Sequence, residues 1–150
     1  MIRSVIAVSE VNKQTARRFF EAVLNEGRLE LIDELIALDY LGHVSCLDRA
    51  VVGPAGMRRF VCSRRRRHPG LCVVIEDQLA EDDRVVTRWR AAVAPPPATA
   101  VAPPTHAKGG TRGLTVAYRG ISIIRVLAGK QVDSHTECIG PLPETHPRCF

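Results

Sequence analysis

The sequence lacks any apolar run long enough to cross a membrane. A membrane-spanning helix needs about 20 consecutive apolar residues, and no stretch of the 150-residue chain approaches that length. Residues 1–8 hold one charge and a short apolar run, without the long apolar segment and the small-residue cleavage site of a signal peptide. We therefore expect no membrane partner and interpret residues 1–11 as a ragged N-terminal arm.

Paired cysteines are also missing. The chain has five cysteines, an odd number, and no two of them have the C-x-x-C spacing of a metal or redox site. Disulfide frameworks are typical of shorter secreted chains, so we expect a reducing, cytoplasmic location. Most of these thiols are expected to fill apolar space as small hydrophobic side chains. The five are Cys46, Cys62, Cys72, Cys138 and Cys149.

One cluster of arginines supplies much of the formal net charge of +5. Arg64–Arg67 closely follow Arg58 and Arg59, and such a run can bind nucleic acid through the phosphates. However, aromatic side chains that would stack on bases are not interleaved with the run, and acidic residues are spread through the rest of the chain. Cations in the last turn of a helix also complement the helix dipole. We therefore favour a solvated helix end over a nucleic-acid partner.

The composition, 45% hydrophobic and 25% charged, is that of a single globular domain. In the first half of the chain, apolar residues recur with helical spacing. They predict a helix at 12–26 and a short second helix from Leu29 that stops before Asp39. A third predicted helix begins at Gly53-Pro54, because proline is favourable in a first turn, and it ends before Gly70.

After Gly70 the period changes from helical to extended. Residues 94–113, rich in proline, alanine and glycine, predict a long loop, and residues 141–150 predict an extended tail. The fold class is therefore α+β: a cone in which N-terminal helices pack on a curved antiparallel sheet and enclose a pocket, over residues 12–140. The predicted strands are 71–75, 84–91, 114–126 and 131–138.

Several segments, taken in order, resemble the SnoaL-like polyketide cyclases of the nuclear-transport-factor-2-like superfamily. The similarity covers roughly residues 12–140, and it depends on the order and spacing of the segments more than on any single one. The matching segments are Asn12 to Val23, Asn25-Glu26-Gly27, Ile32 to Leu35, Asp39-Tyr40 with His43, Gly53-Pro54 with Phe60, Pro69, Val85 to Trp89, Pro103-Pro104-Thr105, Gly120 to Arg125 and Gly129-Lys130.

The resemblance implies a cone with a deep pocket, commonly in a dimer. Cyclases of this family close a polyketide ring by intramolecular aldol condensation without a metal or cofactor, so no cofactor is expected here. That chemistry needs an acid or base to move the proton next to a carbonyl, and hydrogen-bond donors to hold the enolate. The family's acid/base is an aspartate on the last strand, four positions past a tryptophan.

The last strand departs from this pattern. Aligning Gly129-Lys130 with the family places His135 at the tryptophan position and Ile139 at the aspartate position, and isoleucine cannot transfer a proton. A shift of two residues would instead bring Glu137 to the aspartate position. Because His135 and Glu137 lie two residues apart on a strand, we expect their side chains to share one face. On the concave face they would form an acid/base pair, and on the convex face they would be solvent or dimer-interface residues.

These considerations yield two sets of candidate site residues. His43 lies where the family often carries a pocket histidine, and it joins the two residues of the last strand as a candidate for proton transfer. The catalytic candidates are therefore His43, His135 and Glu137. The substrate-binding candidates are Tyr40, Trp89, Phe19 and Phe60; the alternative for Trp89 and Tyr40 is a plain core role. His106, in the predicted loop, either caps the pocket mouth or is exposed.

Two functions remain open from the sequence. The first is a cofactor-free cyclase or isomerase of secondary metabolism, acting by acid/base chemistry on an apolar, polyketide-like molecule. The second is a non-catalytic module of the same fold that binds a small ligand or a partner protein, and the isoleucine at position 139 favours it. A homodimer is expected in either case.

Overall fold

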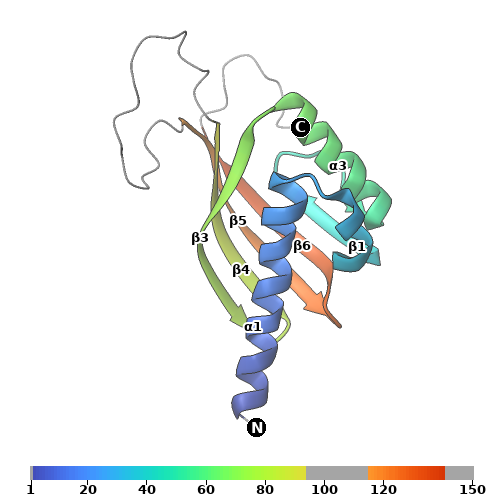
Figure 1. The fold of residues 1–150 in the computed structure, drawn as a ribbon, viewed down its shortest axis with the longest axis vertical. Coiled ribbons are helices and arrows are strands. Elements are labelled where there is room, and N and C mark those ends of the chain that lie inside the picture. The colour runs from blue at the N-terminus through green and yellow to red at the C-terminus, as the bar shows by residue number, and fades with distance from the viewer. Residues whose placement is uncertain (1, 94–114, 141–150) are drawn as a thin grey trace.

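The computed structural model describes residues 2–93 and 115–140, with α1 and α3 on the same side of a single curved sheet of six strands (Figure 1). This arrangement confirms the predicted α+β fold class. None of the helices in these two ranges is long and apolar enough to cross a membrane. The predicted loop 94–113, with His106, and the predicted tail 141–150 lie outside the described residues.

The chain begins with one long helical segment. α1 (Ile2–Arg18) runs directly into a π-helical segment, η1 (Phe19–Asn25). Gly27 follows with a φ of 76°, a left-handed conformation that glycine adopts without strain. The helix predicted at 12–26 is confirmed in position, but it starts at Ile2. The segment interpreted as a ragged arm is therefore helical from that residue on.

The second predicted helix is shorter than expected. η2 (Leu29–Leu31) and α2 (Ile32–Leu35) stop where Ile36 adopts an extended backbone, with φ −118° and ψ 128°. The chain then forms β1 (Ile36–Val44), a strand that the helical spacing from Leu29 onward did not reveal. β1 pairs in parallel with the last strand, so the sheet is mixed and not wholly antiparallel as predicted.

The remaining elements complete the sheet and cover it. The strand order is β2-β1-β6-β5-β4-β3. Register shifts interrupt the β3–β4, β4–β5 and β5–β6 pairings, and such irregularities bend strands, which lets the sheet curve around the helices. The bounds are β2 (Val51–Val52), α3 (Gly53–Arg67), β3 (Leu71–Glu81), β4 (Arg84–Val93), β5 (Thr115–Leu127) and β6 (Lys130–Ile139).

The apolar core lies between the helices and the concave face of the sheet. α1 packs on β3 and β4, and α3 packs on β1. Burial of one aliphatic side chain stabilises the fold by about 1.5–3 kcal/mol, so a few such residues hold the layers together. Those with almost no exposure to water include Val23, Ile32, Leu35, Val61, Val85 and Val126.

Two leucines near the start of β1 allow a test of which side chains face the core there. Leu35 is buried, whereas Leu38 is 89% exposed. We expect Leu35→Ala to lower the free energy of unfolding by about 2–5 kcal/mol, because it leaves a cavity in the core. The matched change Leu38→Ala should alter it by less than about 0.5 kcal/mol. Urea denaturation measures both values, and equal losses would contradict the outward orientation of Leu38.

Candidate functional site

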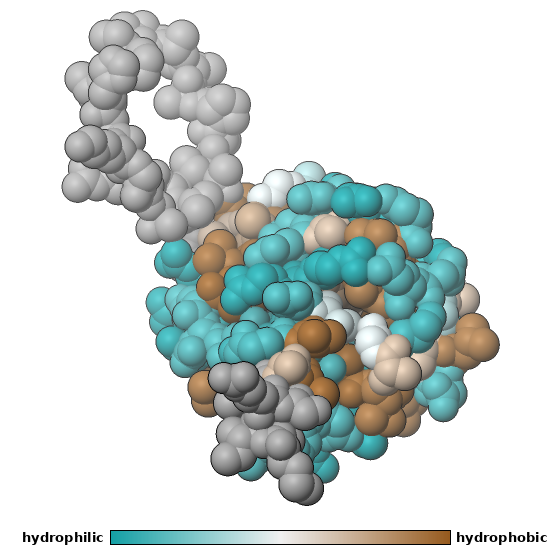
Figure 2. Space-filling model, turned by 60° about the horizontal axis from the view of Figure 1, so that its bottom comes forward, coloured by the Kyte–Doolittle hydropathy of each residue, from teal (hydrophilic) through white to brown (hydrophobic). Residues whose placement is uncertain are grey.

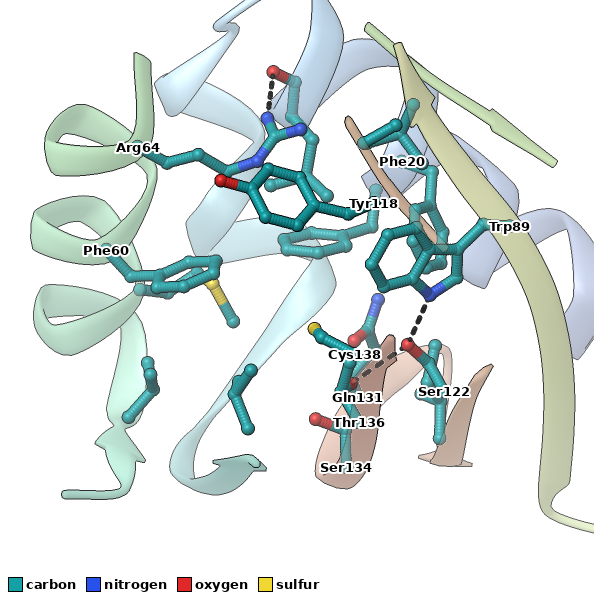
Figure 3. A pocket seen from close by; sticks show the side chains of 18 of the residues that line it. Phe20, Phe60, Arg64, Trp89, Tyr118, Ser122, Gln131, Ser134, Thr136 and Cys138 are labelled. Carbon is teal, nitrogen blue, oxygen red and sulfur yellow. Dashed lines mark hydrogen bonds between the residues drawn. The ribbon is translucent and has the colours of Figure 1, made fainter. Parts of the chain in front are cut away.

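A pocket lies between the helices and the concave face of the sheet (Figure 3). The centres of water-sized spheres can occupy about 80 Å³ inside it. A single buried water needs roughly 10–15 Å³ by the same measure, so the pocket has room for more than one water molecule. Its wall is mostly apolar and unusually rich in aromatic rings. The aromatic residues of the wall are Phe19, Phe20, Tyr40, Phe60, Trp89 and Tyr118.

All four residues predicted to bind substrate line this pocket. Phe19 reaches it from η1, Tyr40 from β1, Phe60 from α3 and Trp89 from β4. The fold thus brings together side chains that lie far apart in the sequence. Their contact with a ligand remains a prediction.

The three residues predicted to be catalytic lie elsewhere. His43 and His135 are paired neighbours on β1 and β6, and their rings stack with centroids 5.0 Å apart. Glu137 follows two residues later on β6, and all three side chains are exposed and absent from the pocket wall. The prediction that His135 and Glu137 share a face is correct. Of the two faces left open for this pair, the residues occupy the outer one.

The alternation of β6 explains this outcome. Ser134, Thr136 and Cys138 point into the pocket, so the residues between them point away from it. Ile139, which the resemblance aligned with the family's aspartate, is 75% exposed on the outer side. An acid at that position would therefore not reach the pocket either.

Trp89 anchors a chain of hydrogen bonds on the pocket floor. Its Nε1–H donates to Ser122 Oγ at 3.0 Å, and Ser122 Oγ lies 2.9 Å from Thr136 Oγ1 (Figure 3). Gly120 lets the indole approach β5 closely, because a Cβ there would collide with the ring. Two hydroxyl protons belong to the Ser122–Thr136 pair, and one suffices for the bond between them. The second proton remains for another acceptor.

Tyr40 and Ser134 form a second hydroxyl pair. Tyr40 Oη lies 2.7 Å from Ser134 Oγ, and both side chains are buried. Burial raises the pKa of Tyr40 to about 12, because the phenolate would lose its hydration. At neutral pH Tyr40 is therefore a hydroxyl, and this pair too holds one proton more than its own bond uses.

Arg64 brings a cation to the pocket wall. It lies on α3 and is only 4% exposed. Its Nη1 donates to Leu24 O at 3.5 Å, a long bond, and its Nη2 has no hydrogen-bond partner. Burial lowers the pKa of Arg64 to about 10, so the guanidinium still carries its charge at neutral pH.

The sequence reading missed Arg64 because it took the arginine run as one solvated group. Arg65, Arg66 and Arg67 are indeed exposed. Arg64, however, follows Met57 and Val61 by seven and three residues, the spacing of one helix face. That spacing was the signal that would have placed it on the buried side of α3.

Gln131 adds another buried donor at the start of β6. It is 1% exposed, and its Nε2 has no hydrogen-bond partner. Together with the hydroxyl pairs and Arg64, it makes the described wall rich in donors. No aspartate, glutamate or histidine among the described residues lines the pocket. Such a wall can hold carbonyl or other oxygen acceptors, but it offers no carboxylate or imidazole as a base.

Residues 2–93 and 115–140 contain no evident set of metal ligands. No group of three or more histidine, cysteine, aspartate or glutamate side chains in these ranges is placed to hold a metal ion.

Comparison with known proteins identifies the type of domain. The profile described as "SnoaL-like domain" matches residues 16–135 of the chain, which is the greater part of its length. This match and the fold confirm the resemblance noted from the sequence segments. No protein of curated function matches the chain in sequence comparison.

Solved structures with the same fold are numerous. A candidate SnoaL-like polyketide cyclase from Jannaschia sp. CCS1 is 19% identical, with a TM-score of 0.67 and 87% of each chain covered. A candidate polyketide cyclase from Acidithiobacillus ferrooxidans is 21% identical, with a TM-score of 0.67 and 87% of this chain and 89% of the other covered. IdmH from Streptomyces antibioticus is 23% identical, with a TM-score of 0.65 and coverages of 85% and 91%. At these identities the likeness establishes the fold alone.

Proposed function

Because the chain belongs to the SnoaL-like domain family, we propose that its pocket binds a small, largely apolar molecule that carries carbonyl oxygens. The observation that supports this proposal is the composition of the described wall. Aromatic rings surround a set of buried hydrogen-bond donors, and no carboxylate or imidazole accompanies them. Carbonyl oxygens accept hydrogen bonds and present no donor of their own, so they complement such a wall.

The apolar and polar parts of the wall have different tasks. Phenyl and indole rings favour a flat, apolar ligand body through burial and dispersion. The Ser122–Thr136 and Tyr40–Ser134 pairs each have a hydroxyl proton to offer. These protons select for oxygen acceptors, because a buried donor left without a partner costs about 1–3 kcal/mol.

Binding without acid/base catalysis is the function that this wall supports best. A cyclase or isomerase is the second candidate, and a specific observation favours it: the same hydroxyl donors would stabilise an enolate oxygen. Catalysis would also require a base near the ligand, and His43, His135 and Glu137 are on the outer face. The cytoplasmic location inferred from the cysteines is part of the proposal.

The proposed homodimer would use the outer face of the sheet. Four apolar side chains on β1, β5 and β6 are exposed there, around the stacked histidines: Leu41, Ile121, Ile123 and Ile139. Figure 2 views a different part of the surface, from the end where α1 begins, and there too hydrophobic groups lie between hydrophilic areas. Exposed apolar side chains gathered on one face are typical of protein interfaces.

Binding of a carbonyl compound can be followed through Trp89, the single tryptophan of the chain. We expect 2-acetylnaphthalene to quench its fluorescence saturably. Ala91→Leu should weaken binding at least about tenfold, because Ala91 lines the pocket and a larger side chain occupies it. His135→Ala, on the outer face, is the matched control and should bind like the wild type. Equal affinity for the Ala91→Leu variant, checked as folded by circular dichroism, would sink the assignment of the pocket.

The same ketone separates binding from catalysis. A base in the pocket would exchange the methyl protons next to the carbonyl with deuterium oxide faster than buffer does. Since the described wall has no such base, we expect the rate of buffer alone, measured by proton NMR. Saturable acceleration that the Ala91→Leu change abolishes would instead favour the cyclase or isomerase.

The dimer is tested by light scattering. We expect the wild type to have twice the monomer mass of 16.5 kDa and Ile123→Lys to be monomeric, because a charge at the centre of an apolar interface loses its hydration. Val8→Lys places the same charge on α1, on the opposite side of the sheet, and should leave the dimer intact. A monomeric wild type would contradict the proposal.

A further inference from the structure

We propose that Arg64 anchors a carboxylate group of the ligand, so that the pocket takes an apolar organic acid. The inference builds on the proposed function, because it names the charge of the molecule that the pocket binds. It starts from a contrast within the chain. Arg18, Arg58 and Arg125 pair with carboxylates at the surface, whereas the buried Arg64 pairs with none among the described residues.

The place of Arg64 in the wall supports this role. Its side chain extends from α3 toward Tyr118, among the aromatic residues of the pocket (Figure 3). The groups near enough to influence its charge are Arg65, Cys72, Cys138 and Tyr118. One of these is a second cation, and none of them is a carboxylate. The counter-charge is therefore not supplied by the described protein.

A purely structural role would leave most of the guanidinium unused. Cations near the C-terminus of a helix favourably contact its last carbonyls, and Leu24 O at the end of η1 is such a carbonyl. Arg65 already donates to it at 3.2 Å, and also to Asn25 O. The bond from Arg64 Nη1 is longer, 3.5 Å, and Nη2 makes none. Capping of η1 thus explains Arg65 and not the burial of Arg64.

A carboxylate suits this guanidinium better than a neutral acceptor does. Burial of an unpaired cation is costly, and an anion that also accepts hydrogen bonds offsets the cost. The planar fork of arginine donates two parallel bonds to the two oxygens of a carboxylate. The rest of the ligand would then lie among the aromatic rings, which suits an apolar body.

The sheet register gives the second feature of the ligand. Cys138, near Arg64, pairs with Gly120, and the next inward pair is Thr136 with Ser122. Inward positions on a strand are about 6–7 Å apart. The Ser122–Thr136 pair thus lies one such step beyond Cys138, and an acid held by Arg64 would carry a carbonyl oxygen on the side of this pair, toward its free hydroxyl proton.

Three probes of similar size test the proposal: 2-naphthoate, its neutral methyl ester and 2-acetylnaphthalene, titrated at pH 7 against the fluorescence of Trp89. We expect the wild type to bind 2-naphthoate at least about tenfold more tightly than the ester. Arg64→Met keeps a long apolar side chain and removes the charge, so it should abolish this preference while the affinity for the ester changes less than about twofold. Arg65→Met is the matched control and should retain the preference.

The stability of Arg64 variants distinguishes a residue that anchors the ligand from one that holds the fold together. We expect Arg64→Met to unfold at a urea concentration no lower than the wild type, because it removes a buried charge without a partner. Arg64→Lys, which keeps the charge and loses the fork, should retain part of the preference and serves if the methionine variant does not fold. A methionine variant that is less stable and still prefers the acid would overturn the proposal.

The probes also distinguish a failure of the carboxylate anchor from a failure of the proposed function. If the ester and the ketone bind and the acid binds no better, the carboxylate anchor is wrong and the carbonyl-binding pocket stands. If none of the three probes binds, the proposed function fails and the anchor fails with it.

Discussion

The alternation of β6 is the constraint on which the rest of the site depends. This strand is paired on both sides, in parallel with β1 and antiparallel with β5, so its register cannot slip without breaking two ladders. A slip of one residue would exchange the two faces of the strand. Because Ser134 and Thr136 face the pocket, His135 and Glu137 must face outward. The chemistry of the pocket is therefore decided by hydroxyl groups and not by the ionisable residues beside them.

This constraint gives the pocket a one-sided hydrogen-bonding character. Each hydroxyl pair retains a proton after its internal bond, and the indole of Trp89 can only donate. Arg64 adds donors that carry a positive charge. In surroundings of low polarity these groups attract an oxygen acceptor strongly. In the proposed complex the aromatic wall would limit the size of the ligand, and the donors would determine which atoms it presents.

The sequence predicts the layers of the fold well because they depend on local periodicity. The helix at 12–26 and the strands after Gly70 follow from the spacing of apolar residues, and the pocket positions of Phe19, Tyr40, Phe60 and Trp89 follow from the family resemblance. Strand β1 was not predicted, because Ile32, Leu35 and Ile36 also fit a helical face. Which face of β6 is concave could not be read at all, since it depends on pairing with a strand almost a hundred residues away.

Arg64 and Arg65 illustrate how adjacent residues of the same type acquire different physical roles. One step along a helix rotates the side chain by about 100°, which is enough to carry it from solvent to the pocket wall. Arg65 satisfies the carbonyls at the end of η1 from the exposed side. That arrangement leaves the neighbouring guanidinium of Arg64 with one long bond to Leu24 O, although the side chain is almost fully buried. An opposite charge stabilises a buried guanidinium of this kind, which is the physical basis of the acidic ligand proposed for the pocket.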